Sequence, residues 1–400
     1  MKKILIFSTI SPVPTNRGDR TRLLQTAKNQ SNFATVRLVF LDRAWESCEY
    51  DFSLLPGVEI ISLKVAKSEM YAQIARSILS LKPYAFYKLM SPRIIKFFLA
   101  QMDDFKPDIF WAHQIDTYPL FREIESLGIP KVLDIADSIS LHYDAARKEP
   151  NPSLKMRITS NSQINLDRAE KDCICQSDRL IVSSHDNIKH LTNKYSGLPN
   201  NLEVVHVHVD QDILNQTWKL DLNRPNNLLF VGYLAYPPNA LAVSYVIEEV
   251  LPKLKDRLDV NFIVCGSGEQ QLAQKYKNNP NIIFKGFVKD LSEEYLNASA
   301  MISPAPFASG VQTKLVEAMA IGLPSIISAK TLIANGVIDR THVVACESAD
   351  DFADAVIDLM TNQTLANTLS SASKLLVVKE HTSDVQTDKL REIVAQVSPN

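Results

Sequence analysis

The stretch from Ala300 to Ala329, "AMISPAPFASGVQTKLVEAMAIGLPSIISA", joins two short apolar runs through a helical pattern. Leu315 to Ile321 predict a short apolar helix, and Gly322 and Pro324 predict its end. Apolar runs on either side of a helix are typical of parallel strands that helices cover on both faces. The stretch therefore predicts one strand–helix–strand unit of an α/β sheet.

The same alternation extends outward over most of the chain. The runs of the first half are "ILIFST", "VRLVFL", "VEIISL", "DIFWAH", "KVLDIA", "RLIVSS" and "VVHVHV", and those of the second half are "NLLFVGYL", "NFIVCG", "IIFKGFV", "AMISPAP", "PSIISA" and "HVVAC". They are too many for one doubly wound sheet, so we expect two Rossmann-like α/β domains facing each other across a cleft. The predicted boundaries are 1–210 for the N-terminal domain, 211–226 for a polar linker and 227–382 for the C-terminal domain, with a last helix at about 383–400 packing back on the N-terminal domain.

Composition limits the class of protein. The 400 residues are 46% hydrophobic and 22% charged, which is typical of a soluble globular chain, and the net charge of −2 argues against a nucleic-acid-binding protein. No run approaches the roughly 18 apolar residues of a membrane span, and "MKKILIFSTISPVP" predicts a first buried strand rather than a signal peptide. The cysteines predict reduced thiols in a cytoplasmic protein without a metal site; they are Cys48, Cys173, Cys175, Cys265 and Cys346.

The entrance of the helix after Ser309 is the main candidate site. Gly310, Thr313, Lys314 and Glu317 recur at spacings of three and four, so they share one side of the helix near its N-terminus. Helix N-termini bind phosphate groups, and a glutamate deeper in the same groove can accept hydrogen bonds from paired hydroxyls. The alternative is a solvated ion pair between Lys314 and Glu317.

Three other strand-to-helix turns of the second half carry unusual residues. Gly232 and Tyr233 begin a loop whose prolines fix its shape before a helix capped by Asn239, although a rigid connector is an equal alternative. Gly266 and Gly268 suggest a dinucleotide fingerprint, but Gln271 stands where its third glycine belongs, which argues against an NAD site.

The third of these turns is Gly286-Phe287-Val288. The Phe287 side chain is expected either to pack in the core or to form the wall of a base pocket.

The first turn of the chain, "STISPVPTNRGDRTR", is a further candidate. Gly18 lets the backbone approach a ligand, Asp19 is a plausible helix cap, and Arg20 and Arg22 follow it. The alternative is that Asp19 only caps the helix and the arginines are solvated.

Five motifs in order resemble one known family. "VEAMAIGLPSIIS", preceded by Gly310 and Lys314, resembles the C-terminal signature of the retaining glycosyltransferases of family 4, and so do "FVGYLAYPPNALAV", "IVCGSGEQQL" and "FKGFVKDLSEEYLNASAMISP". "SPVPTNRGDRTR" and "FASGVQTKLVEAMAIG" resemble a bacterial subgroup associated with exopolysaccharide assembly.

The resemblance implies the two-domain GT-B architecture, with a nucleotide-diphosphate sugar held by the C-terminal domain and no cofactor. Glu317 would bind the ribose hydroxyls, and Lys314 with the backbone of Val311, Gln312 and Thr313 would bind the diphosphate. The remaining donor-side residues would be Gly232, Tyr233, Gly266, Gly286, Phe287, Val288 and Gly310, while Gly18 would approach the diphosphate from the acceptor side.

The sequence departs from the family at three places. Ser309 stands where a first glutamate usually contacts the transferred sugar, and the Arg and Lys that usually follow the Gly232 strand are absent. Lys314, with Arg20 or Arg22, would have to replace those cations. The usual "NGVD" appears as "VHVD", which ends at Asp210.

The acceptor side is expected in the N-terminal domain. "HQID" and "DIADSIS" follow two predicted strands, so His113, Asp134 and Asp137 are candidates for assisting an acceptor hydroxyl. The predicted catalytic residues are Lys314, His113 and Asp137, and the predicted acceptor-side residues are Gly18, Asp19, Arg20, Arg22 and Asp134. A buried histidine and capping aspartates are the alternative.

The segment "KPYAFYKLMSPRIIKFF", residues 82–98, mixes basic and aromatic residues. That mixture suits an anionic membrane surface or a lipid-linked acceptor, which would place the protein at the inner face of the cytoplasmic membrane. The alternative is that the aromatic residues pack inward and the lysines are solvated.

The leading hypothesis is therefore a glycosyltransferase that acts in bacterial surface polysaccharide or glycoconjugate assembly. The first alternative is a catalytically silent subunit of the same fold that binds nucleotide, glycan or a partner enzyme. The second is a nucleotide-sugar epimerase of the same architecture.

Overall fold

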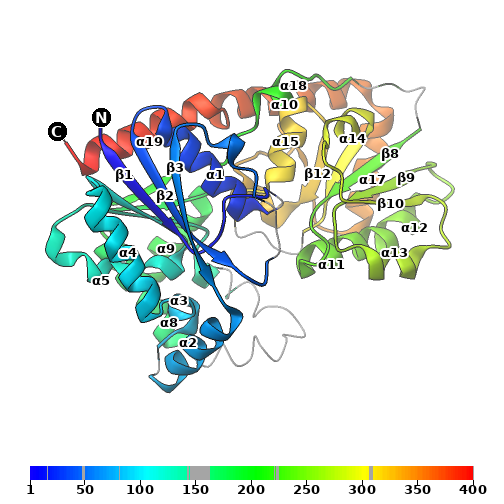
Figure 1. Ribbon diagram of the computed structural model, residues 1–400. Helices are drawn as coiled ribbons and strands as arrows, with labels where there is room; N and C mark the ends of the chain where they lie inside the picture. Colours follow the sequence, from blue (N-terminus) through cyan, green and yellow to red (C-terminus); the bar gives the residue numbers. More distant parts are fainter. Residues whose placement is uncertain are drawn as a thin grey trace. The chain divides into compact units, whose positions relative to one another are not determined.

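The computed structural model divides the chain into two compact units. Unit 1 comprises Met1–Val207 and Gln386–Asn400, and unit 2 comprises His208–Val385. The structure describes residues 1–15, 17–46, 50–80, 82–141, 144, 163–219, 221, 225–305 and 310–399. Each unit has one parallel sheet with helices on both faces (Figure 1).

The sheet of unit 1 has the strand order β3-β2-β1-β4-β5-β6-β7. Its strands are β1 (Lys3–Ser8), β2 (Thr35–Arg43), β3 (Val58–Val65), β4 (Ile109–His113), β5 (Lys131–Ala136), β6 (Arg179–Val182) and β7 (Leu202–Val204), and all pairs are parallel. The order reverses between β1 and β4, which is the switch point where open α/β sheets bind ligands at their carboxyl ends.

Two apolar layers cover the faces of this sheet. Alternate side chains of β1 point to opposite layers, so Phe7 packs with Phe98 of one layer and Ile6 with Trp111 of the other. The helices of unit 1 are α1 (Gly18–Ser31), α2 (Lys67–Leu79), α3 (Tyr84–Tyr87), α4 (Pro92–Phe105), α5 (Leu120–Glu123), α8 (Gln163–Gln176), α9 (His185–Lys194) and α19 (Ser383–Val397). Leu390, Ile393 and Val394 of α19 complete the second layer.

The sheet of unit 2 has the strand order β10-β9-β8-β11-β12-β13. Its strands are β8 (Asn227–Val231), β9 (Asn261–Cys265), β10 (Ile282–Gly286), β11 (Ala300–Ser303), β12 (Ser325–Ser328) and β13 (Val344–Cys346), again all parallel. The order reverses between β8 and β11. Residues 300–329 contain the strand–helix–strand unit β11–α15–β12, as predicted.

The helices of unit 2 flank this sheet. They are α10 (Gln211–Leu214), α11 (Pro237–Tyr245), η4 (Val246–Val250), α12 (Leu251–Leu254), α13 (Gln270–Tyr276), α14 (Ser292–Asn297), α15 (Thr313–Ile321), α16 (Leu332–Asn335), α17 (Ala349–Thr361) and α18 (Gln363–Glu380). α15 ends as predicted, because Gly322 adopts φ 89° and donates to Ala318 O and Met319 O.

The predicted fold class of two doubly wound α/β domains is confirmed. One run differs, since β7 ends at Val204 and the rest of "VVHVHV" is not strand. Within the segment predicted as a linker, α10 and the buried Trp218 pack in unit 2, and Trp218 Nε1 donates to Ala298 O at 2.7 Å.

None of the helices in the described part of the chain is long and apolar enough to cross a membrane. The described cysteines are free thiols, and only Cys175 of these is exposed. Cys48 lies outside the described residues.

Candidate functional site

The entrance of α15 is held from two sides. Gln312 occupies the cap position; its N–H donates to Asn335 Oδ1 at 2.8 Å, and its Oε1 accepts from Ser303 Oγ at 2.7 Å. Ser303 ends β11 and Asn335 ends α16, so two neighbouring elements fix the loop. The N–H groups of Thr313 and Lys314 lie too early in the helix to have intrahelical partners, and they are therefore the donors available to an anion.

Lys314 is a half-buried cation without an acidic partner among the described residues. Its Nζ donates to Asn239 Oδ1 at 3.3 Å and lies 4.1 Å from the centroid of the Phe230 ring. Burial lowers the pKa of Lys314 to about 7. A nearby anion would counter this penalty, because an opposite charge favours the protonated amine.

Glu317 lies one turn further along α15 and has a partner of its own. Its Oε2 accepts from the hydroxyl of the fully buried Tyr295 at 2.9 Å. Burial, together with the charge of Asp210, raises the pKa of Glu317 to about 7, while the Tyr295 bond acts in the opposite direction. The alternative of a solvated Lys314–Glu317 ion pair is therefore wrong: each side chain is half-buried and bonded to a different element.

The glycines of the neighbouring turns let three loops pack together. Gly232 N donates to Cys265 O and Gly266 N donates to Gly286 O, at 2.9 and 2.7 Å. Gly266 has φ 141°, and a Cβ atom there would lie 1.9 Å from Gly232 O. At Gly268 a Cβ atom would lie 2.6 Å from Ala235 N. This pair of glycines thus serves the contact between the β8 and β9 loops.

Asn239 does not cap its helix as predicted. α11 begins at Pro237 with Tyr236 in the cap position and no side-chain cap. The amide of Asn239 instead reaches back to Tyr233 O at 2.9 Å while its oxygen accepts from Lys314. Sequence analysis missed this role because Asn239 and Lys314 are 75 residues apart.

Two aromatic side chains project from these loops. Phe287 is 68% exposed and Tyr233 is 48% exposed, so Phe287 is not a core residue. Val288 is half-buried against the apolar cluster of unit 2 that contains Leu315. Both rings are accessible to a planar ligand. Gly310 is buried, Val311 and Thr313 are half-buried, and Ser309 lies outside the described residues.

In unit 1 the predicted residues His113, Asp134 and Arg22 come together at the ends of β4, β5 and α1. Arg22 Nε lies 2.7 Å from Asp134 Oδ1, and the same guanidinium donates to Val205 O at 2.7 Å. His113 is fully buried, with Nε2 3.3 Å from Asp19 O and Nδ1 3.9 Å from Asp134 Oδ2. Burial lowers the pKa of His113, which keeps its imidazole neutral near pH 7.

Other predicted residues of unit 1 have structural partners. Arg20 is buried and forms an ion pair with Glu46, so it is not solvated. Asp19 does not occupy the cap position of α1, which begins at Gly18 with Arg17 in that position. The Asp19 carboxylate accepts from the Arg17 side chain and from the N–H of Arg20. Asp137 accepts from Ser183 Oγ at 2.6 Å and from Asn187 Nδ2 at 3.2 Å. Gly18 is exposed at the first position of α1.

A second charged cluster beside Arg20 was not predicted. Thr9 Oγ1 donates to both carboxylate oxygens of Asp116 at 3.0 Å, and Lys88 Nζ lies 3.4 Å from the same carboxylate. Arg43 donates to Thr9 O and to Glu46, at 2.8 and 3.1 Å. The available signal was position, because Thr9 directly follows β1 and Asp116 lies three residues after the end of β4.

The backbone is strained at the same edge of the sheet. Gln114, after β4, has φ 77° and ψ 146°, and Ala136, at the end of β5, has φ 58°. Such conformations are costly for residues with a side chain and cluster at functional sites.

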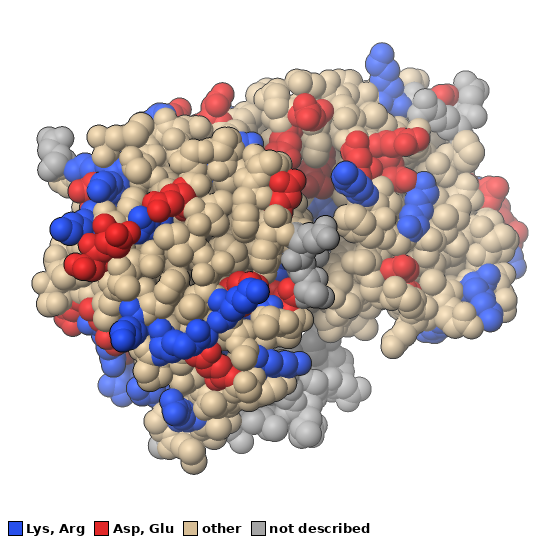
Figure 2. Space-filling model, in the orientation of Figure 1, with Lys and Arg blue, Asp and Glu red and all other residues tan. Residues whose placement is uncertain are grey.

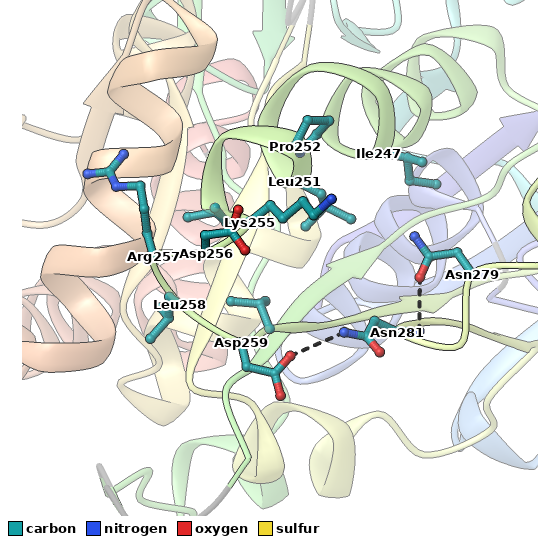
Figure 3. Close-up of a pocket in the computed structure, with 12 residues that line it drawn as sticks. Ile247, Leu251, Pro252, Lys255, Asp256, Arg257, Leu258, Asp259, Asn279 and Asn281 are labelled. Atoms are coloured by element: carbon teal, nitrogen blue, oxygen red, sulfur yellow. Dashed lines mark hydrogen bonds between the residues drawn. The ribbon is translucent and has the colours of Figure 1, made fainter.

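A cavity of about 730 Å³ lies in unit 2 at the amino ends of the strands, opposite the edge that carries the α15 entrance (Figure 3). It opens between the end of α12 and the starts of β9 and β10, and includes Leu251, Lys255, Asp259 and Asn281. Two of its polar side chains bond each other, because Asn281 Nδ2 donates to Asp259 Oδ1 at 3.2 Å. The cavity contains none of the predicted site residues.

Comparison with known proteins places this geometry in context. Residues 225–362 match the family model of the glycosyl transferases group 1. No curated protein matches the chain.

Solved structures match almost the whole chain at low identity. Sucrose-phosphate synthase (tll1590) from Thermosynechococcus elongatus superposes with a TM-score of 0.74 at 14% identity, covering 99% of both chains. Anabaena Alr3699/HepE in complex with UDP-glucose gives 0.68 at 14% identity, covering 99% of this chain and 100% of that one. WaaG, a glycosyltransferase involved in lipopolysaccharide biosynthesis, gives 0.68 at 14% identity, covering 97% and 99%. The chain therefore has the GT-B fold, and the match to the glycosyl transferases group 1 lies within its second unit.

Proposed function

We propose that the protein is a glycosyltransferase that moves a sugar from a nucleotide-diphosphate sugar to a glycan or lipid-linked acceptor. The observation that carries this proposal is Lys314, a half-buried cation at a helix N-terminus with no acidic partner among the described residues. The group 1 match over residues 225–362 supports it, and so does the UDP-glucose bound by Anabaena HepE.

In the proposed complex the leaving diphosphate lies at the entrance of α15. The N–H groups of Thr313 and Lys314 donate to its oxygens, and the Lys314 ammonium stabilises the charge that develops as the sugar departs. Glu317, oriented by Tyr295, accepts from the ribose hydroxyls. The base packs against Phe287 and Val288, beyond Gly286.

On the acceptor side, His113 is fully buried, which favours the alternative of a buried histidine over contact with the incoming hydroxyl. Burial lowers the pKa of its ring, and no described residue accepts or donates a hydrogen bond at Nδ1. A role in proton transfer would require this edge of unit 1 to open to the acceptor. For Asp137, the bonds to Ser183 and Asn187 favour the structural alternative.

The family resemblance extends the proposal to transfer with retention, in the family 4 manner. The acceptor would attack from the face that the diphosphate leaves, so the principal task of the protein is to stabilise that diphosphate. The same resemblance suggests a cytoplasmic enzyme of surface polysaccharide or glycoconjugate assembly, acting at the inner face of the membrane.

The silent partner subunit is the second candidate. It is favoured by the β8 loop, where Tyr233 to Tyr236 supply no basic residue, and by Ser309 in place of a glutamate. Such a subunit would bind a nucleotide without turning over a nucleotide sugar.

One experiment separates these functions. A panel of nucleoside diphosphates is tested for its effect on the melting temperature, since a ligand that binds only the native state stabilises it. The corresponding nucleotide sugars are then incubated with the protein, and free diphosphate is measured. Stabilisation with diphosphate release supports the transferase, and stabilisation without release supports the silent subunit. If no diphosphate stabilises the protein, both proposals are wrong.

A further inference from the structure

Helix α2 (Lys67–Leu79) presents large apolar side chains to solvent. Its buried residues are Gln73 and Ser77, whereas Tyr71, Ile78 and Leu79 are 56%, 60% and 85% exposed. Met70 and Ile74 are half-buried on the inward side, and Met70 packs against the core of unit 1. A surface helix normally exposes a polar face, whereas α2 carries apolar residues on its outward side as well.

The exposed apolar residues lie on one side of the helix. At 3.6 residues per turn, Ile78, Tyr71, Ala75, Leu79 and Ala72 fall within about a third of the helix circumference, which they share with the exposed Ser68. Lys67 borders this arc on one side and Arg76 borders it on the other, and both are exposed. We name the five apolar residues, together with Lys67 and Arg76, the α2 face.

The charge around the α2 face is positive. Glu69 is the only acidic residue of α2, and it is bound by Ser91 and by Arg93, the latter at 2.8 Å. Lys82 follows the helix and is exposed. In Figure 2, Lys and Arg side chains gather on the lower part of unit 1, in the region where Figure 1 draws α2.

We propose that the α2 face docks on an anionic membrane surface. An apolar arc bordered by basic residues matches a helix that lies in the plane of the lipid headgroups, with aliphatic and tyrosine side chains in the acyl boundary and ammonium and guanidinium groups at the phosphates. The inference is independent of the donor chemistry. If the proposed function holds, this surface of unit 1 would bring the enzyme to a lipid-linked acceptor.

The location differs from the segment expected from the sequence. In residues 82–98, Phe86 and Phe98 are fully buried, so those rings pack inward and do not reach a membrane.

A second copy of the chain is a poorer occupant of the α2 face than lipid. A two-fold contact through the α2 face would bring Lys67 and Arg76 of both copies together.

The test is flotation of the full-length protein with vesicles. We expect binding to vesicles of phosphatidylcholine with phosphatidylglycerol, little binding to phosphatidylcholine alone, and release at high salt. The double variant Ile78→Glu/Leu79→Glu should lose at least ten-fold in vesicle affinity. The matched control is Leu375→Glu/Val378→Glu on α18, whose side chains are 70% and 49% exposed.

The melting temperature and the diphosphate-induced stabilisation of each variant report folding and the donor site separately. They should be unchanged, because the altered side chains are exposed. Absence of wild-type binding to anionic vesicles at low salt overturns the proposal, and so does an equal loss in the α18 control. A concentration-dependent dimer that the α2 variant abolishes would also overturn it, by assigning the face to a second copy.

Discussion

The two switch points of the molecule treat charge in opposite ways. At the β1/β4 edge of unit 1, arginines are bound by acidic side chains, as in the Arg22–Asp134 and Arg20–Glu46 pairs. At the entrance of α15 in unit 2, the partners of Lys314 within the described part of the chain are the neutral oxygen of Asn239 and the face of Phe230. The paired charges of unit 1 stabilise its fold, whereas the cation of α15 is available for an anionic ligand. Four substitutions or titrations test this difference.

The largest effect is expected on the stability of unit 1. Asp134→Asn leaves the Arg22 guanidinium buried without its counterion, which should lower the free energy of unfolding by about 3–5 kcal/mol. Chemical denaturation measures this change. Asp104→Asn is the control, because that carboxylate is 69% exposed in its pair with Arg37 and should contribute less than about 1 kcal/mol. Equal effects of the two substitutions would contradict the structural role of the buried pair.

The second substitution acts on turnover and spares stability. Lys314→Ala removes the cation at the proposed diphosphate site, so kcat should fall about 10²–10³-fold. The free protein should not lose stability through charge, because the substitution removes a partly desolvated cation. Lys277→Ala, on the exposed surface of the same unit, should retain activity. Full turnover by Lys314→Ala would remove the proposed role of this lysine.

The pH dependence of stability sharpens the same point. The pKa of Lys314 is lowered to about 7, so between pH 7 and its ordinary pKa of 10.5 the unfolded chain binds more protons than the folded one, and stability should rise with pH. For Glu317 the pKa is raised to about 7, so stability should fall from pH 4.5 to 7. Together they predict a local minimum near pH 7 in the free protein.

Comparing wild type with Lys314→Met isolates the lysine contribution. As the pH rises above 7, the free energy of unfolding of the wild type should increase relative to that of the variant, by up to about 1.4 kcal/mol for each unit by which the pKa is lowered. A stability difference that does not change between pH 7 and 10 would show that the lysine is fully solvated.

The smallest effect concerns the orientation of Glu317. Tyr295→Phe removes one hydrogen bond to the carboxylate, which should raise the KM of the donor by about 3–10-fold while leaving kcat nearly constant. The loss should disappear with a 2′,3′-dideoxynucleotide donor, because that donor makes no ribose contact to weaken. An equal loss with both donors would indicate a general disturbance of α14.

The order of the elements could be predicted from the sequence, because buried parallel strands have near-continuous apolar sequences such as "ILIFST" and "NLLFVGYL". The ligand-facing turns could also be predicted, since they follow those runs directly. The partners of the charged residues could not. Arg22 meets Asp134 across 112 positions and Glu317 meets Tyr295 across 22, and no local spacing encodes such contacts. The spacing of Lys314 and Glu317 suggested an i, i+3 ion pair, because the sequence does not show that Asn239 and Tyr295 are their partners in the fold.

The position of α19 has a consequence for how the protein is made. Its Leu390, Ile393 and Val394 cover the layer formed by Ile4, Ile6 and Trp111, so unit 1 is closed by a segment that follows unit 2 in the chain. Until that segment has been synthesised, the nascent unit 1 exposes an apolar patch, whereas unit 2 is contiguous and can complete its core earlier. A product that ends before α19 should therefore be prone to aggregation through that patch.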